Sequence, residues 1–367
     1  MTNIIVIVAV AALCLVPVAQ AADEGGGAAH GAGMTFLWIV IILLAARFSA
    51  LVERLGQPPV LGELLVGVIL GNLTLLGINL FEPIKTEPII NFLAQLGVVI
   101  LLFQVGLESN IQEMRRVGTR AFLVACVGVV VPFFLALAVV GPLLLPGLSF
   151  NTYLFLGATL TATSVGITAR VFRDLGKLQT SEAQIVLGAA VIDDVLGLII
   201  LAVVSAIVTE GTVSLGSVSW ITLKAVLFLA GAIVIGQILA PRLGMLFSKI
   251  HTGISMKFSL AICFGLFTAF LAEQIGLAPI VGAFAAGLVL DPVHFRYFEN
   301  PKFADDIQES ISDAEPGVKE RVLSVIERHT DRHIEDIIEP LGHFLAPIFF
   351  VVTGMNVRLE TLFNLPV

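Results

Sequence analysis

Two adjacent aspartates, Asp193 and Asp194, interrupt an apolar run that extends from about residue 185 to residue 208. An ionised carboxylate at the centre of a membrane-spanning helix costs roughly 2.5–3.5 kcal/mol on insertion scales. A chain that keeps two of them therefore places them against a cavity lined by protein or water. Acids at this depth are typical of an ion or proton pathway, and the structural alternative is a pairing with a distant lysine.

The two aspartates are neighbours on a helix, so their side chains diverge by about 100°. They do not form the close pair of carboxylates that an aspartic protease needs, because that chemistry requires two groups that face each other. One carboxylate that takes either a proton or a small cation is the minimal chemistry of exchange, since a protonated carboxyl group is a poor ligand for Na⁺. The spacing favours exchange over an intramembrane aspartyl protease.

Hydroxyl groups cluster in the preceding apolar segment, which reads Thr161-Ala162-Thr163-Ser164-Val165-Gly166-Ile167-Thr168. At mid-membrane this composition suits a helix that unwinds and offers carbonyl and hydroxyl oxygens to a cation. Its small residues are also compatible with close helix packing, which is the structural alternative. Because the segment directly precedes the aspartates, we predict that Thr161, Thr163 and Ser164 shape the ion site and that Na⁺ binds transiently at Asp194.

Two further acids lie near the ends of apolar segments. Glu63 follows Pro58 and Pro59, which suit a helix start, and it fits an internal hydrogen bond as well as a role in ion access. Glu108 ends the motif that contains Gln104, and we expect it to pair with Arg115 or another cytoplasmic base. Glu63, Gln104 and Glu108 are therefore predicted supporting residues.

The composition is that of a polytopic helical membrane protein. Of the 367 residues, 57% are hydrophobic and 13% are charged, and the mean hydropathy is +1.00. Soluble domains average about 25% charged residues. Runs long enough to cross the hydrocarbon core predict about ten spans, at residues 35–52, 58–76, 89–107, 121–145, 151–171, 183–208, 218–240, 256–273, 277–291 and 340–357.

The basic residues predict the orientation of these spans. Of the twenty Lys and Arg, all but Lys85, Lys224 and Arg358 fall on one side if the N-terminus is outside, which makes that side cytoplasmic. Residues 1–21 resemble a signal peptide, and residues 22–34 are then a flexible external tether. We predict a bacterial inner membrane protein that contacts the lipid bilayer. No basic stripe indicates nucleic-acid binding.

The long polar loop over residues 292–339 accounts for most of the net charge of −8. It fits an amphipathic cytoplasmic hairpin that packs on the inner surface of the protein, or a regulatory element for an unknown partner. His329 and His333 are one helical turn apart, which is compatible with a metal site, but histidines in a charged loop are usually only solvated. We expect no cofactor besides the transported Na⁺ or K⁺ and H⁺.

At these residues the chain resembles the monovalent cation:proton antiporter superfamily, in its Kef-type and NapA-like branch. The resemblance covers nearly all of the chain after the leader, with its motifs in the family's order. The motifs are Gly56-Gln57-Pro58-Pro59-Val60-Leu61-Gly62-Glu63-Leu64-Leu65, Leu101-Leu102-Phe103-Gln104-Val105-Gly106-Leu107-Glu108, Thr161-Ala162-Thr163-Ser164, Asp193-Asp194, Gly282-Ala283-Phe284-Ala285-Ala286-Gly287 and Ile348-Phe349-Phe350-Val351-Val352-Thr353-Gly354-Met355.

The resemblance implies an all-α inverted-repeat fold of about thirteen spans with discontinuous helices, and a homodimer whose core domain moves across the membrane. It implies that Asp194 is the main ion carboxylate and that Asp193 accompanies electrogenic exchange. Residues 35–209 then form the first repeat, residues 210–253 a linker span, and residues 254–367 a partial second repeat. The family adds about three further spans after the segment matching Ile348–Met355, so we expect this chain to lack them.

These features predict a secondary active antiporter that exchanges a monovalent cation for protons by alternating access, and not an enzyme. Na⁺ is the expected cation, with Li⁺ or K⁺ as alternatives, and pH homeostasis is the expected role. A Kef-type potassium efflux transporter is the alternative. It predicts a C-terminal nucleotide-binding domain, and the sequence contains no glycine-rich βαβ pattern for one.

Overall fold

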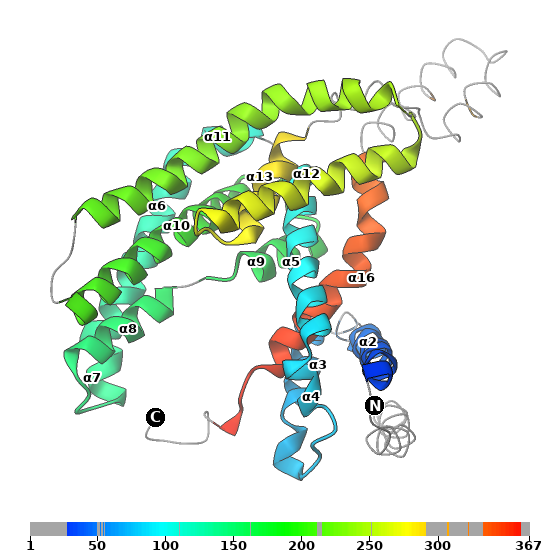
Figure 1. Ribbon diagram of the computed structural model, residues 1–367. Coiled ribbons are helices and arrows are strands. Elements are labelled where there is room, and N and C mark those ends of the chain that lie inside the picture. Colours follow the sequence, from blue (N-terminus) through cyan, green and yellow to red (C-terminus); the bar gives the residue numbers. More distant parts are fainter. Residues whose placement is uncertain are drawn as a thin grey trace. The chain divides into compact units, whose positions relative to one another are not determined.

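A computed structural model describes the chain at residues 28–49, 52, 54, 56–109, 111–161, 163–210, 215–250, 252–290, 307, 322 and 333–360. Every regular element in these described residues is a helix, as Figure 1 shows. A helix satisfies its backbone hydrogen bonds internally, which is what a segment in hydrocarbon requires. The predicted leader at residues 1–21 and His329 of the predicted loop lie outside the described residues, as does the side chain of His333.

The chain divides into two compact units, of which the first contains residues 1–98 and 343–367. Its helices are α2 (Ala28–Ser49), α3 (Pro59–Gly71), η2 (Leu73–Leu76), α4 (Glu82–Thr86), the first part of α5 (Pro88–Glu108) and the last part of α16 (His333–Met355). Glycines bring α3 and α16 into direct backbone contact, because a Cβ atom on Gly67 would overlap the carbonyl oxygen of Val351. Small residues of this kind allow close packing in a membrane, where no hydrophobic effect drives helices together.

The second unit spans residues 99–342. After the end of α5 it contains α6 (Ile111–Leu135), a π-helical turn (Ala136–Val140), α7 (Gly141–Leu144), α8 (Phe150–Thr161), α9 (Val165–Asp174), α10 (Ser181–Glu210), α11 (Leu215–Ser248), α12 (Ile254–Gln274), α13 (Pro279–Val289) and the start of α16. Within it α10 packs along α6 and α8, and α12 packs along α13. Backbones also meet at the crossing of α5 and α13, where a Cβ atom on Gly287 would overlap the carbonyl oxygen of Phe103.

Seven helices in the described residues are long and apolar enough to cross a membrane. Large apolar side chains remain exposed on their outer faces, including Phe122 and Phe134 of α6 and Leu227 and Ile235 of α11. A soluble domain rarely exposes such continuous apolar surface, whereas a bilayer covers it. The predicted all-α membrane fold is confirmed.

Helix ends differ from the predicted spans in several places, and the largest shift is at α6, which begins at Ile111 rather than near residue 121. The first helix begins at Ala28 rather than near residue 35, inside the predicted tether. The helix α11 continues to Ser248, beyond the expected end near residue 240. The helix α16 begins at His333 rather than near residue 340, with Glu335 and Asp336 in its first turn, where acids are favoured by the helix dipole.

Candidate functional site

The predicted interruption in the hydroxyl-rich segment is present. The helix α8 ends at Thr161 and α9 begins at Val165, with Thr163 and Ser164 outside both helices (Figure 1). The hydroxyl oxygen of Thr163 lies 3.4 Å from the carbonyl oxygen of Thr161. Hydroxyl groups that bond to nearby backbone atoms compete with helical hydrogen bonds, and for this reason the sequence stops one helix and starts another here.

Ser164 is the N-cap of α9. Its backbone is extended, with φ −83° and ψ 103°, and its side-chain oxygen accepts a hydrogen bond from the backbone N–H of Ile167. An N-cap of this type satisfies one of the free donors at the start of a helix. The remaining backbone N–H groups and the helix dipole make this end of α9 favourable for negative charge.

Asp193 lies beside this interruption. It is 8% exposed and sits on α10, which packs against α9, and its carboxylate interacts with the hydroxyl group and the backbone N–H of Thr163. The next residue, Asp194, is half-buried and lies close enough to Asp193 for the two like charges to repel. The structure therefore brings together three of the predicted site residues: Asp193, Asp194 and Thr163.

Both aspartates have an oxygen without a hydrogen-bond partner. In the described part of the chain, Asp193 Oδ1 and Asp194 Oδ2 are buried and accept no hydrogen bond. Buried polar atoms without a partner are rare in native proteins, and each costs about 1–3 kcal/mol or more when charged. Two such oxygens on adjacent residues form an arrangement that binding a proton or a cation would stabilise.

The other predicted residues have different surroundings. Thr161 is 2% exposed, and its hydroxyl group donates to Ala158 O within α8 at 2.8 Å, so that its hydroxyl hydrogen is already used. Glu63 is 5% exposed and belongs to α3 in the first unit. Gln104 and Glu108 lie at the end of α5 in the second unit, in a separate polar cluster.

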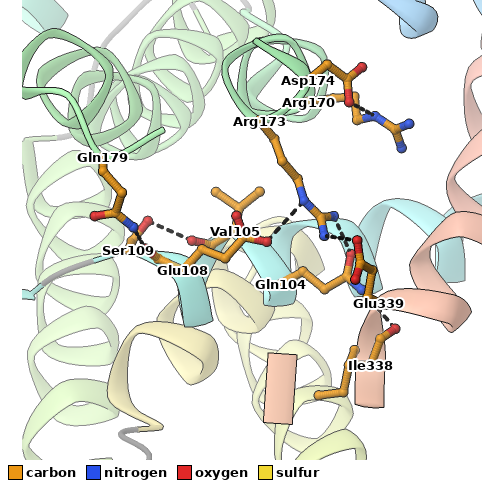
Figure 2. A network of polar contacts seen from close by, with 10 residues as sticks. All are labelled: Gln104, Val105, Glu108, Ser109, Arg170, Arg173, Asp174, Gln179, Ile338 and Glu339. Carbon is orange, nitrogen blue, oxygen red and sulfur yellow. Dashed lines mark hydrogen bonds and ion pairs between the residues drawn. The ribbon is translucent and has the colours of Figure 1, made fainter. Parts of the chain in front are cut away.

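Figure 2 shows this second cluster, in which Arg173 of α9 reaches the end of α5. Arg173 Nε lies 3.0 Å from Glu108 Oε1, and Arg173 Nη1 donates to Gln104 Oε1 at 2.7 Å. Gln104, which is 2% exposed, donates in turn to Ile338 O on α16 at 2.8 Å. The prediction that Glu108 pairs with a base is confirmed, and that base is Arg173. We call Gln104, Glu108, Arg173 and Glu339 the Arg173 cluster.

Sequence reasoning assigned Arg173 to the cytoplasmic side but gave it no role. Its partner Gln104 lies 69 positions earlier in the chain, and no local spacing connects the two. A signal was nonetheless present. An uncharged amide in the otherwise apolar run from Leu101 to Leu107 needs a hydrogen-bond partner once it is buried.

Comparison with known proteins identifies related sequences and a related fold. The pattern of the family described as "Sodium/hydrogen exchanger, transmembrane" matches residues 39–367. The high-affinity Na⁺/H⁺ antiporter of Synechocystis is 33% identical over 356 residues, covering 89% of this chain and 69% of that protein. A Na⁺/H⁺–K⁺ antiporter of Bacillus cereus is 32% identical over 332 residues, covering 90% of this chain and 73% of that protein.

Among solved structures, a sodium/proton antiporter from Methanocaldococcus jannaschii matches with a TM-score of 0.52. The match covers 91% of this chain and 73% of the other, at 17% sequence identity. A likeness at this identity shows a shared fold.

Proposed function

Because the chain belongs to the sodium/hydrogen exchanger family, we propose that it exchanges Na⁺ for protons across a membrane by alternating access, with Asp194 as the carboxylate that binds either ion. The observation that carries this assignment is the pair of buried, unpartnered oxygens on Asp193 and Asp194. Two neighbouring buried charges are unfavourable unless something neutralises them. A proton or a sodium ion at Asp194 does so, and each excludes the other.

Asp193 supplies the second charge of the site. Its interaction with the hydroxyl and N–H groups of Thr163 holds the Asp193 carboxyl group beside Asp194. The hydroxyl and carbonyl oxygens near the interruption after Thr161 add further oxygen ligands to the carboxylates. Hard cations, among them the alkali cations, prefer such ligands. Ser164 contributes by starting α9, and Thr161 by its backbone, since its hydroxyl group bonds within α8.

The setting of this activity follows from the charge distribution and the family. The excess of Lys and Arg on one side supports an N-terminus outside the cell membrane after cleavage of a leader. Membership of the family supports a homodimer and a role in pH homeostasis. The names of the relatives do not favour the Kef-type alternative, and adjacent carboxylates on one helix give an intramembrane protease no facing pair.

Exchange by the full chain in lipid vesicles tests the assignment. A sodium gradient should drive proton movement, read with a pH-sensitive dye, and Asp194→Asn should abolish it because an amide neither ionises nor releases a proton. Glu182→Gln is the matched control, since Glu182 is an exposed carboxylate on the same helix. Full-rate, pH-dependent exchange by Asp194→Asn would show that another group carries the ions.

A further inference from the structure

Arg173 joins the second half of the interrupted helix to two other helices of the same unit. Its guanidinium group contacts Glu108 and Gln104 at the end of α5, and it lies 3.9 Å from Glu339 Oε1 on α16. Figure 2 shows the side chain of Arg173 extending from α9 into this group of residues. Arg170, one turn earlier on α9, instead pairs with Asp174 of its own helix at 2.8 Å.

The residues that Arg173 contacts have a fixed geometry. Gln104 uses Nε2 to donate to Ile338 O and Oε1 to accept from Arg173, so that the orientation of its amide is determined. A Cβ atom on Gly342 would overlap that amide, which shows how closely α16 lies against it. Gln179 further donates to the carbonyl oxygen of Glu108. The groups that bind Arg173 are therefore themselves fixed in position and would not move with it.

The other end of α9 lies at the ion site. Arg173 is the ninth residue of a ten-residue helix whose N-cap is Ser164, and Thr163, which interacts with Asp193, precedes that cap. A helix of this length extends about 15 Å and behaves as a rigid rod. Displacing the Arg173 end therefore displaces Thr163 relative to Asp193.

We propose that Arg173 is a positioning residue for ion exchange, which holds α9 so that the interruption at Thr163 faces Asp193. This inference rests on the proposed function for its transport readout. The chemistry requires arginine in particular. Its planar fork contacts Glu108 through Nε and Gln104 through Nη1 at the same time, whereas a lysine has a single point charge and cannot reproduce both directions.

Vesicle transport by the full chain tests the proposal. Arg173→Ala should raise the apparent KM for Na⁺ roughly tenfold, as loss of a supporting residue around a metal site does, with a smaller change in maximal rate. Arg173→Lys should fall between Arg173→Ala and the unchanged protein. Lys177→Ala is the matched control, because it removes an exposed positive charge just after α9 and should leave KM within about twofold.

Two further measurements separate positioning from a general loss of structure. If Arg173 acts through Gln104, the double variant Arg173→Ala/Gln104→Ala should raise KM no more than the larger single effect, since changes at contacting residues are not additive. Amide hydrogen exchange should also speed up over residues 165–174 in Arg173→Ala but not in Lys177→Ala. Glu108→Gln gives a milder test, with about a threefold rise in KM, should Arg173→Ala fail to insert.

The outcomes distinguish this proposal from the function on which it rests. If Arg173→Ala shows faster amide exchange in α9 but the unchanged protein transports no ions, the proposed function is refuted. The role of Arg173 in holding α9 in place then stands. Normal transport with unchanged KM and unchanged amide exchange in Arg173→Ala would overturn the positioning role and leave the antiport assignment intact.

Discussion

The two polar clusters of the second unit differ in how completely their groups are hydrogen-bonded. At Asp193 and Asp194, one buried oxygen of each carboxylate has no partner in the described residues. At Gln104, the amide both donates to Ile338 and accepts from Arg173. Both clusters involve α9, one at each of its ends.

This difference distinguishes a cluster that binds an ion from a cluster that stabilises the structure. Satisfied buried groups fix one structure, whereas unsatisfied ones cost free energy that a ligand can recover. The aspartates should therefore matter for transport and little for stability. The Arg173 cluster should contribute to stability and affect transport through geometry alone.

The largest effect is expected from removing both charges at the ion site. Asp193→Asn/Asp194→Asn should reduce exchange at least about a hundredfold, while the free energy of unfolding stays the same or rises, because each buried charge costs roughly 2.5–3.5 kcal/mol. Vesicle transport and thermal unfolding in detergent measure the two quantities. A marked loss of thermal stability would show that the aspartates are structural after all.

The second effect concerns Gln104, whose side-chain amide both donates and accepts a hydrogen bond. Gln104→Leu should lower the free energy of unfolding by about 1–3 kcal/mol, since it removes the buried hydrogen bond to Ile338 O and the acceptor of a guanidinium N–H of Arg173. Gln237→Leu is the matched control, because Gln237 is exposed on α11 and the same change there should be neutral or stabilising in detergent. Equal melting temperatures for the two variants would contradict the distinction.

The pH dependence of transport provides a third test. If Na⁺ and H⁺ compete for the same oxygens, lowering the pH fills the site with protons, and the apparent KM for Na⁺ rises by up to about tenfold per pH unit at the acidic limit. Raising the pH has the opposite effect until KM reaches a constant value. Glu108→Gln should keep this slope, and a KM independent of pH in the unchanged protein would refute direct competition.

The smallest effect is expected at Asn72, a half-buried and well-bonded amide in the first unit. Asn72 donates to Val357 O at 2.7 Å and accepts from the backbone N–H of Leu359 at 2.8 Å, which ties the segment after α16 to the end of α3. Asn72→Ala should cost about 0.5–1.5 kcal/mol of stability and leave exchange unchanged. A cost as large as that of Gln104→Leu would mean that burial is not what separates the two sites.

Hydropathy alone predicted the helical membrane fold, because a segment in lipid has few alternatives to a helix. The interruption between Thr161 and Val165 was also predictable, since its cause is local hydroxyl chemistry. The partner of Arg173 was not, because it depends on where α5 and α9 meet in space. The early start of α16 at His333 was missed because its first turn is too polar to register as a span.

The interruption of the hydroxyl-rich helix also has a consequence for biosynthesis. The helix α8 has 12 residues and α9 has 10, so each extends only about 15–18 Å, well short of the roughly 30 Å of hydrocarbon. Neither half can leave the translocon as a stable span. The two halves together form one apolar segment of 25 residues, Phe150–Asp174, and we expect them to enter the bilayer as a unit.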